Sequence, residues 1–252
     1  MFKVKATVVG FAGDQELYPC HMGHKVGDEV IFDGESYHGR LCPDVWPLIA
    51  PKVSALHQAG PRYKEPAAYY PFWYTSVSTK DESMKKYDGL GYRCNLNTIV
   101  PPPHDMANLV PPNAYKWPPH ETRDIMNAVT VTCLDSRTSM VVMLEAFDLS
   151  DKGFDVPFFR RQMAILQKLK TFGPTAAEKM LETFTEAQRE NIYPPLGGVL
   201  VEIMLEELVL MGYAELKDGV ASLTDKGELK LASFIGSLTE EERELFGDYA
   251  RR

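Results

Sequence analysis

The chain has 252 residues, of which 44% are hydrophobic and 25% are charged. This length suits one large domain or two small ones, and the composition is that of a globular protein rather than a disordered or fibrous one. The formal net charge of −8 argues against broad binding to nucleic acid, because an acidic surface repels phosphate. No apolar run approaches the roughly 20 residues of a membrane span, and the first residues lack the apolar core of a signal peptide. We therefore expect a cytoplasmic protein with no membrane partner.

The amino-terminal part predicts a small mixed domain of strands and one helix. Alternating apolar residues indicate a strand over Phe2–Phe11, and a short second strand is expected at 30–32. A helix is predicted from about residue 45 to 58. The two apolar stretches 129–132 and 140–147 flank a polar, turn-prone connection and predict a hairpin.

Residues 61–127 predict a long irregular insertion into this domain. The stretch 61–120 holds ten of the chain's 18 prolines and ten of its 27 aromatic residues. Proline interrupts helices and sheets, whereas so many aromatic residues are unlike a solvated linker. We expect an ordered segment that packs against its own domain or against a partner subunit.

The carboxy-terminal part changes to helical spacing of its apolar residues. A polar stretch at 148–155 is the predicted linker, and the second domain is expected over 156–252. A two-stranded hairpin is expected around the turn signal Lys217-Asp218-Gly219. Helices are predicted, in order, at about 158–169, 175–184, 199–211, 228–235 and from Thr239 onward.

This order of helices and hairpin resembles a winged-helix domain. The segment Gly212-Tyr213-Ala214 and the later segment Ser222-Leu223-Thr224-Asp225-Lys226-Gly227 are similar to the end of a recognition helix and its wing. Residues 151–252 carry 18 acidic and 13 basic side chains, and the third predicted helix contains glutamates but no lysine or arginine. Because DNA binding needs cations, we expect a protein-interaction or dimerisation module, and DNA is an improbable partner.

Three amino-terminal stretches resemble a family of small uncharacterised prokaryotic proteins. They are the opening strand at 3–9, the signature Cys20-x-x-Gly23-His24-Lys25-Val26-Gly27-Asp28-Glu29 with Leu41-Cys42-Pro43, and the closing hairpin that begins Val129-Thr130-Val131-Thr132-Cys133-Leu134-Asp135. The resemblance implies a domain over residues 1–150 that residues 61–127 interrupt. It also implies that Cys20, Cys42 and Cys133 belong to one small domain, whereas Cys94 lies in the insertion.

These cysteines form a candidate metal site with a nearby histidine. Cys20, His24 (or His21), Cys42 and Cys133 would supply the thiolate and imidazole ligands that zinc or another divalent metal takes tetrahedrally. No Cys-x-x-Cys pair supports the assignment. The alternatives are three buried thiols that act as small apolar groups, with the histidine in a local hydrogen bond, and thiol redox or nucleophilic chemistry.

Acid–base candidates lie in several loops. Asp28 is either a turn residue that accepts backbone hydrogen bonds or a catalytic carboxylate. The pairs His104-Asp105 and His120-Glu121 each place an imidazole beside a carboxylate, as in acid–base or metal-ligating sites. Their structural alternatives are a surface turn and the start of a helix.

An aromatic cluster in the insertion is a candidate ligand pocket. Tyr69, Tyr70, Trp73 and Tyr74 could surround an apolar or aromatic molecule, or they could pack in a core or a subunit interface. The chain has no glycine-rich phosphate motif and no nucleophile elbow, so we expect neither a nucleotide cofactor nor serine-hydrolase chemistry.

The sequence therefore predicts an α+β protein with two domains and leaves three functions open. The first is a cytoplasmic enzyme or enzyme subunit that acts on a small molecule, such as an aromatic one, by metal-assisted hydrolysis or lyase chemistry. The second is a non-catalytic assembly protein that forms homo-oligomers or binds a partner subunit. The third is a winged-helix transcriptional regulator that senses a metal or the thiol state.

Overall fold

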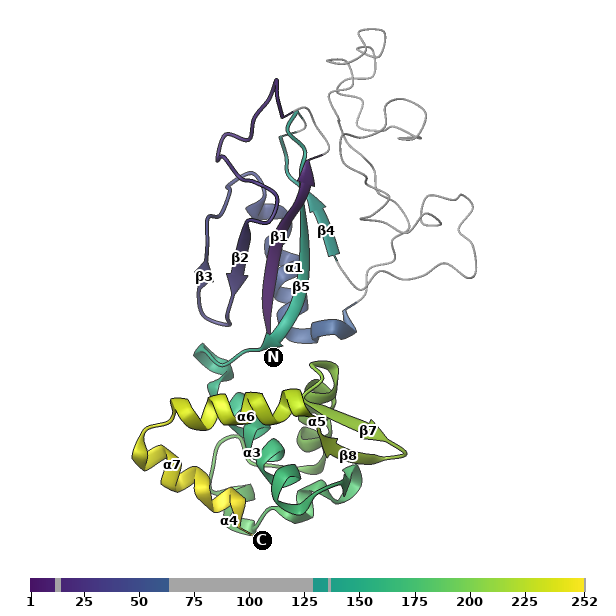
Figure 1. Cartoon of the computed structure of the whole chain (residues 1–252), viewed down its shortest axis with the longest axis vertical. Helices are drawn as coiled ribbons and strands as arrows, with labels where there is room; N and C mark the ends of the chain where they lie inside the picture. The colour runs from purple at the N-terminus through teal and green to yellow at the C-terminus, as the bar shows by residue number, and fades with distance from the viewer. Residues whose placement is uncertain (12–14, 64–128, 136, 252) are drawn as a thin grey trace. The chain divides into compact units, whose positions relative to one another are not determined.

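The computed structural model describes residues 1–11, 15–63, 129–135 and 137–251 (Figure 1). It is a mixed α+β structure, as the sequence predicts. The chain divides into two compact units. The amino-terminal unit comprises Val4–Phe32 and Ser36–Ala146, and the carboxy-terminal unit comprises Phe147–Arg252 together with Met1–Lys3 and Asp33–Glu35. Outside the described residues lie nearly all of the predicted insertion and these residues of it: Tyr69, Tyr70, Trp73, Tyr74, Cys94, His104, Asp105, His120 and Glu121.

The amino-terminal unit is built on a five-stranded sheet with the order β3-β2-β1-β5-β4. Strand β1 pairs antiparallel with β2, and β4 pairs antiparallel with β5 as the predicted hairpin. The strands are β1 (Phe2–Phe11), β2 (Glu29–Phe32), β3 (Tyr37–His38), β4 (Val129–Thr132) and β5 (Met140–Leu149). Every second side chain of β1 is buried, which is the alternation that predicted the strand.

One helix covers this sheet and closes the core. Helix α1 (Trp46–Ala59) begins one residue later than predicted and ends in a short 3-10 turn, Gly60–Arg62. Its buried residues Ile49, Val53 and Leu56 belong to the same apolar cluster as buried residues of β1, β4 and β5. Figure 1 shows α1 behind the strands.

The carboxy-terminal unit combines helices with a small antiparallel sheet of order β6-β8-β7. Its helices are α3 (Val156–Phe172), α4 (Glu186–Glu190), α5 (Gly198–Leu210), α6 (Asp225–Ser237) and α7 (Glu240–Gly247), and its strands are β6 (Thr175–Ala176), β7 (Ala214–Lys217) and β8 (Val220–Leu223). Three 3-10 helices complete its described part, at Gly153–Asp155, Ala177–Thr183 and Asp248–Ala250.

Local sequence signals explain several of these elements. The β7–β8 turn has positive φ at both central residues, Asp218 (51°) and Gly219 (77°), which the twist of a two-residue hairpin requires. Thr239 and Glu242 form the capping box that starts α7, and Thr185 and Gln188 form the one that starts α4. The hairpin and the last helix therefore confirm the sequence prediction.

Two predictions in this unit hold only in part. The expected helix at 175–184 is a 3-10 helix over Ala177–Thr183 that follows strand β6, because Thr175 and Ala176 pair with β8 from a distant part of the chain. The expected linker at 148–155 begins inside β5. There the Asp148 carboxylate accepts hydrogen bonds from the Tyr213 hydroxyl (2.5 Å) and from Lys230 Nζ (2.6 and 2.8 Å). No helix among the described residues has both the length and the apolar composition of a bilayer span.

Candidate metal centre

Three side chains of the amino-terminal unit meet where two loops approach each other. His21 lies in a tight turn after β1, in which the Gly23 amide donates to the Cys20 carbonyl oxygen (2.8 Å). Cys42 and Asp44 lie just before α1. The Cys42 carbonyl oxygen accepts hydrogen bonds from the amides at 45 and 46 (3.2 and 3.0 Å), which fixes the chain direction at the start of the helix.

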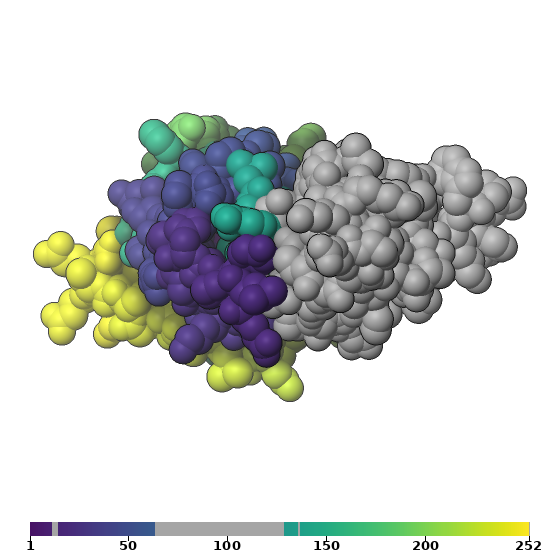
Figure 2. Space-filling view, turned by 90° about the horizontal axis from the view of Figure 1, so that it is seen from above, coloured from purple at the N-terminus to yellow at the C-terminus, as the bar shows by residue number. Residues whose placement is uncertain are grey.

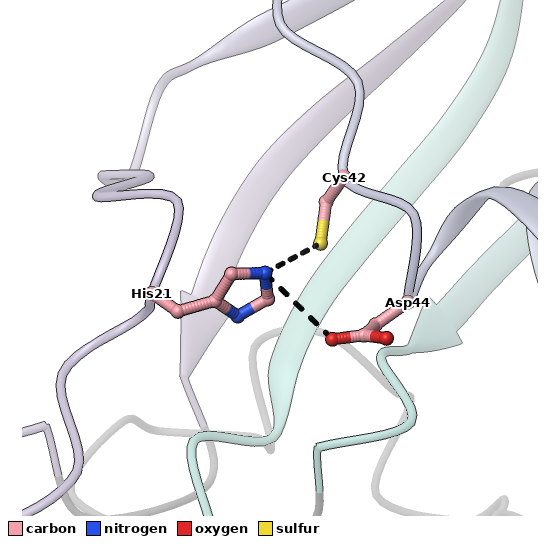
Figure 3. A group of neighbouring side chains, drawn as sticks. All are labelled: His21, Cys42 and Asp44. Atoms are coloured by element: carbon pink, nitrogen blue, oxygen red, sulfur yellow. Dashed lines mark hydrogen bonds and ion pairs between the residues drawn. The ribbon is translucent and has the colours of Figure 1, made fainter.

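The donor atoms of these side chains converge. Nε2 of His21 lies 4.0 Å from Sγ of Cys42 and 3.8 Å from Oδ2 of Asp44, and all three donor atoms lie within 4.8 Å of one another (Figure 3). Cys42 is buried, with 3% of its surface exposed. The side chains of His21 and Asp44 are 50% and 45% exposed. The group is therefore anchored in the core at the thiol and open to solvent on its other side.

The spacing is close to what one bound ion needs. Ligands at about 2.0–2.3 Å from a tetrahedral zinc ion lie about 3.3–3.8 Å apart. The Nε2–Oδ2 separation of 3.8 Å is at the upper end of this range, the Nε2–Sγ separation of 4.0 Å exceeds it by about 0.2 Å, and the separation between the thiol sulfur and the carboxylate oxygen is no more than 4.8 Å. Imidazole, thiolate and carboxylate are all zinc ligands, so a small movement of exposed side chains would complete a three-ligand site.

The same geometry does not fit a Cys–His–Asp nucleophile. Such a catalytic arrangement uses one ring nitrogen for the thiol and the other for the carboxylate that orients the ring. Here Cys42 and Asp44 both face Nε2 of His21, as the two dashed lines of Figure 3 show. Three ligand atoms within 4.8 Å of one another, with two of them facing the same ring nitrogen, favour a shared cation over a proton relay.

The set predicted from the sequence is brought together only in part. Among the residues that the structure describes, His21, Cys42 and Asp44 are the one such group of three donors, so Cys42 and the alternative histidine belong to it. Cys20 packs beside the core without joining the group. Cys133 likewise stays outside: its Sγ accepts a hydrogen bond from the Met140 amide (3.2 Å) and lies 3.5 Å from the Asp135 carbonyl oxygen. Burial raises the pKa of the Cys133 thiol to about 11.

His24 and Asp28 hold the signature loop together. Nδ1 of His24 lies 3.2 Å from Oδ2 of Asp28, and the same oxygen accepts the Lys25 amide (3.0 Å). The Lys25 hydrogen bond, followed by the His24 contact, keeps the pKa of Asp28 below its ordinary value. Gly27, at φ 93°, makes the turn possible. Asp28 thus has the partners expected of a turn residue.

Asp44 was missed by the sequence analysis. The motif Leu41-Cys42-Pro43 is part of the signature described above, but the sequence analysis assigns no role to the aspartate that follows it. The position of Asp44 could have pointed to it. It follows Cys42 by two residues at the start of a helix, so both side chains leave the same turn of the chain.

An open depression adjoins the candidate metal centre. His21 and Asp44 line it, together with Leu17 and Tyr18 from the first loop and Leu134, Asp135 and Arg137 from the β4–β5 connection. Figure 2 shows the purple atoms of the amino-terminal segment beside the teal atoms of this connection. The Thr138 hydroxyl donates to the Tyr18 carbonyl oxygen (3.0 Å) and so ties the two loops together.

Comparisons with known proteins found nothing on which a functional assignment could be based, so the candidate metal centre rests on its geometry. No family model matches the chain, and searches of curated proteins and of solved structures found no match either. The family resemblance and the winged-helix resemblance therefore stay predictions.

Proposed function

We propose that the amino-terminal unit binds one zinc-class divalent ion through His21, Cys42 and Asp44, and that the protein is an enzyme that uses this ion on a small molecule. The observation that carries the proposal is the convergence of imidazole nitrogen, thiol sulfur and carboxylate oxygen within 4.8 Å. Of the three functions that the sequence leaves open, this convergence supports the metal-assisted enzyme and the metal-sensing regulator, and the lack of lysine and arginine in α5 argues against the regulator.

A catalytic ion fits better than a structural one. Structural zinc sites are closed by four protein ligands, whereas catalytic sites keep three and leave a position for water or substrate. Among the described residues the present group has three ligands, and two of them are about half exposed. An ion in such a position lowers the pKa of bound water and polarises a bound oxygen, which suits hydrolysis or lyase chemistry.

The three residues would divide the work according to their surroundings. Cys42 is the fixed ligand, because its thiol is buried and its carbonyl oxygen is held at the start of α1. His21 and Asp44 can adjust to the ion, since their exposed side chains have room to move. Asp44 is held from its backbone, where its carbonyl oxygen accepts the Leu134 amide (3.3 Å).

Cobalt(II) binding to the full chain tests the proposal. We expect one equivalent to bind with micromolar or tighter affinity and to produce the sulfur-to-metal charge-transfer band of a thiolate ligand. Cys42→Ser should abolish this band, and His21→Ala should weaken binding by at least about tenfold, because each change removes one of three ligands.

Matched controls separate this site from the set predicted by the sequence. Cys20→Ser and His38→Gln alter a cysteine and an exposed histidine of the same unit that lie outside the group, and both should bind cobalt like the wild type. Absence of stoichiometric binding by the wild type would refute the proposal. Loss of binding in Cys20→Ser with retention in Cys42→Ser would transfer the site to other ligands.

The carboxy-terminal unit supports a second, non-catalytic role. We propose that it is a winged-helix module for protein contacts, in which α5 takes the place of the recognition helix and β7–β8 forms the wing. The strand order β6-β8-β7 and the sequence of helices support this interpretation. Helix α5 exposes Glu202, Ile203 and Glu206 and contains no lysine or arginine, so its surface is acidic and partly apolar.

A DNA titration and a mass measurement test this role together. In fluorescence anisotropy at low salt, the protein should bind neither a specific nor a scrambled duplex at micromolar concentration, because no cation of α5 is available to displace counterions. Light scattering should give a mass above that of one chain, and Ile203→Lys should lower it. Sequence-specific DNA binding would instead favour the regulator.

A further inference from the structure

The depression beside the metal centre has the features of a binding site for an organic acid. We propose that it binds a small monocarboxylate with an apolar body, and that Arg137 receives the carboxylate. This inference deepens the proposed function, because the same depression includes His21 and Asp44 and so reaches the open side of the metal centre.

The Arg137 side chain is held in one orientation, but its hydrogen-bonding capacity is only partly used within the described part of the chain. Its Nε donates to Oδ1 of Asp135 (3.2 Å), and its guanidinium carbon lies 5.4 Å from the centre of the Tyr18 ring. Neither terminal nitrogen of Arg137 has a hydrogen-bond partner within the described part of the chain, and 62% of the side chain is exposed. A planar guanidinium held at one edge presents its remaining N–H groups as a fork that matches a carboxylate.

The Asp135 carboxylate is itself fixed by hydrogen bonds, so it can hold the Arg137 guanidinium in place. Besides the arginine side chain it accepts the Arg137 amide (3.1 Å), and the Thr138 hydroxyl lies 3.3 Å from its second oxygen. Burial opposes its ionisation, but the Arg137 hydrogen bonds outweigh burial and keep the pKa of Asp135 below its ordinary value. The ion pair therefore persists at neutral pH and fixes the direction of Arg137.

Two exposed leucines indicate that the part of the ligand away from its carboxylate is apolar. Leu17 and Leu134 both line the depression, and about three fifths of the surface of each residue is exposed. Apolar side chains beside a guanidinium suit a molecule with an apolar body and an anionic end. A divalent metal ion bound by the Cys42 thiolate and the Asp44 carboxylate carries no net charge. The Arg137–Asp135 pair carries none either. The depression therefore has no excess of positive charge, so a singly charged ligand is favoured over phosphate or another dianion.

Benzoate is a suitable probe, with benzamide as its uncharged analogue. Calorimetric titration of the cobalt-loaded full chain should show benzoate binding in the millimolar range or tighter, with benzamide and phosphate at least about tenfold weaker. Arg137→Gln should weaken benzoate binding by at least about tenfold while leaving the cobalt charge-transfer band unchanged. Lys25→Gln removes another exposed cation of the same unit that does not line the depression, and it should bind benzoate normally.

The same titration on metal-free protein separates the two proposals. Weaker benzoate binding that still depends on Arg137 is expected there. If cobalt does not bind but benzoate binding depends on Arg137, the metal proposal fails and the carboxylate site stands. If Arg137→Gln binds benzoate like the wild type, or if benzamide equals benzoate, the carboxylate site is refuted whether or not cobalt binds.

Discussion

Replacing Asp148 by asparagine should destabilise the carboxy-terminal unit strongly. The Asp148 and Lys230 side chains are only 19% and 17% exposed, and their charged atoms lie 2.6 Å apart. Asp148→Asn keeps the shape of the side chain but leaves a largely buried ammonium without its counter-ion. Breaking a buried ion pair costs about 3–5 kcal/mol. Because about a fifth of each side chain reaches water, we expect the lower end, about 3 kcal/mol.

A double-mutant cycle separates the ion pair from other effects. Lys230→Met should cost less, about 2 kcal/mol, since Asp148 would keep its hydrogen bonds from the Tyr213 hydroxyl and the Leu149 amide. The double variant should cost about 3 kcal/mol, which leaves a coupling energy of about 2 kcal/mol. Urea denaturation followed by circular dichroism at 222 nm measures all four free energies of unfolding, because most described helices lie in this unit.

The pH dependence gives an independent test of the same pair. Burial raises the pKa of Asp148, but hydrogen bonds from Lys230 and Tyr213 outweigh it and hold this pKa below its ordinary value. A lowered folded-state pKa contributes stability above the unfolded value, near 3.9, and this stability is lost as the pH falls through the folded-state pKa. The gap between wild type and Asp148→Asn should therefore be constant from about pH 8 to pH 5 and shrink below about pH 4.

Two results would contradict this reasoning. One is an Asp148→Asn variant within about 0.5 kcal/mol of the wild type at pH 7, which is the ordinary range for surface changes. The other is a stability gap that persists undiminished at pH 3. Glu190→Gln, which removes an exposed carboxylate from the same unit, is the matched control and should stay within that ordinary range.

Two further predictions concern a helix contact and a thiol. Gly227→Ala should destabilise by about 2 kcal/mol or more, because a Cβ there would overlap the Tyr213 carbonyl oxygen, whereas Gly236→Ala in the same helix meets no neighbour within 4 Å and should stabilise by up to about 1 kcal/mol. If the two variants shifted the midpoint of thermal unfolding equally, the close approach of α6 to the Tyr213 carbonyl oxygen would be refuted. The alkylation rate of Cys133, measured by mass spectrometry on metal-free protein, should rise about tenfold per pH unit from pH 7 to 10, because burial raises the pKa of its thiol to about 11. A plateau below pH 9 would contradict this.

The metal site illustrates a limit of reading side chains from a sequence. The family resemblance implies that Cys20, Cys42 and Cys133 share one domain, and all three do belong to the amino-terminal unit. It could not show that the Cys133 sulfur is engaged by the Met140 amide, nor that Asp44 faces His21. Those relations depend on how two loops distant in the sequence approach each other, and no local pattern records that approach.

The sequence by itself determined the elements whose causes are local. The alternation in β1, the Asp218-Gly219 turn and the Thr239 cap act within a few residues, so each could be predicted before any fold was known. The tertiary structure alone decided what depends on distant partners. Thr175 and Ala176 became a strand because β8 offered backbone hydrogen bonds, and the partly buried Asp148 carboxylate is accommodated because Lys230 and Tyr213 satisfy its charge. The intrinsic preference of a residue for helix or strand contributes only a fraction of a kcal/mol, whereas hydrogen bonding of a buried polar group contributes more. Where local preference and a distant partner favour different structures, the distant partner therefore decides.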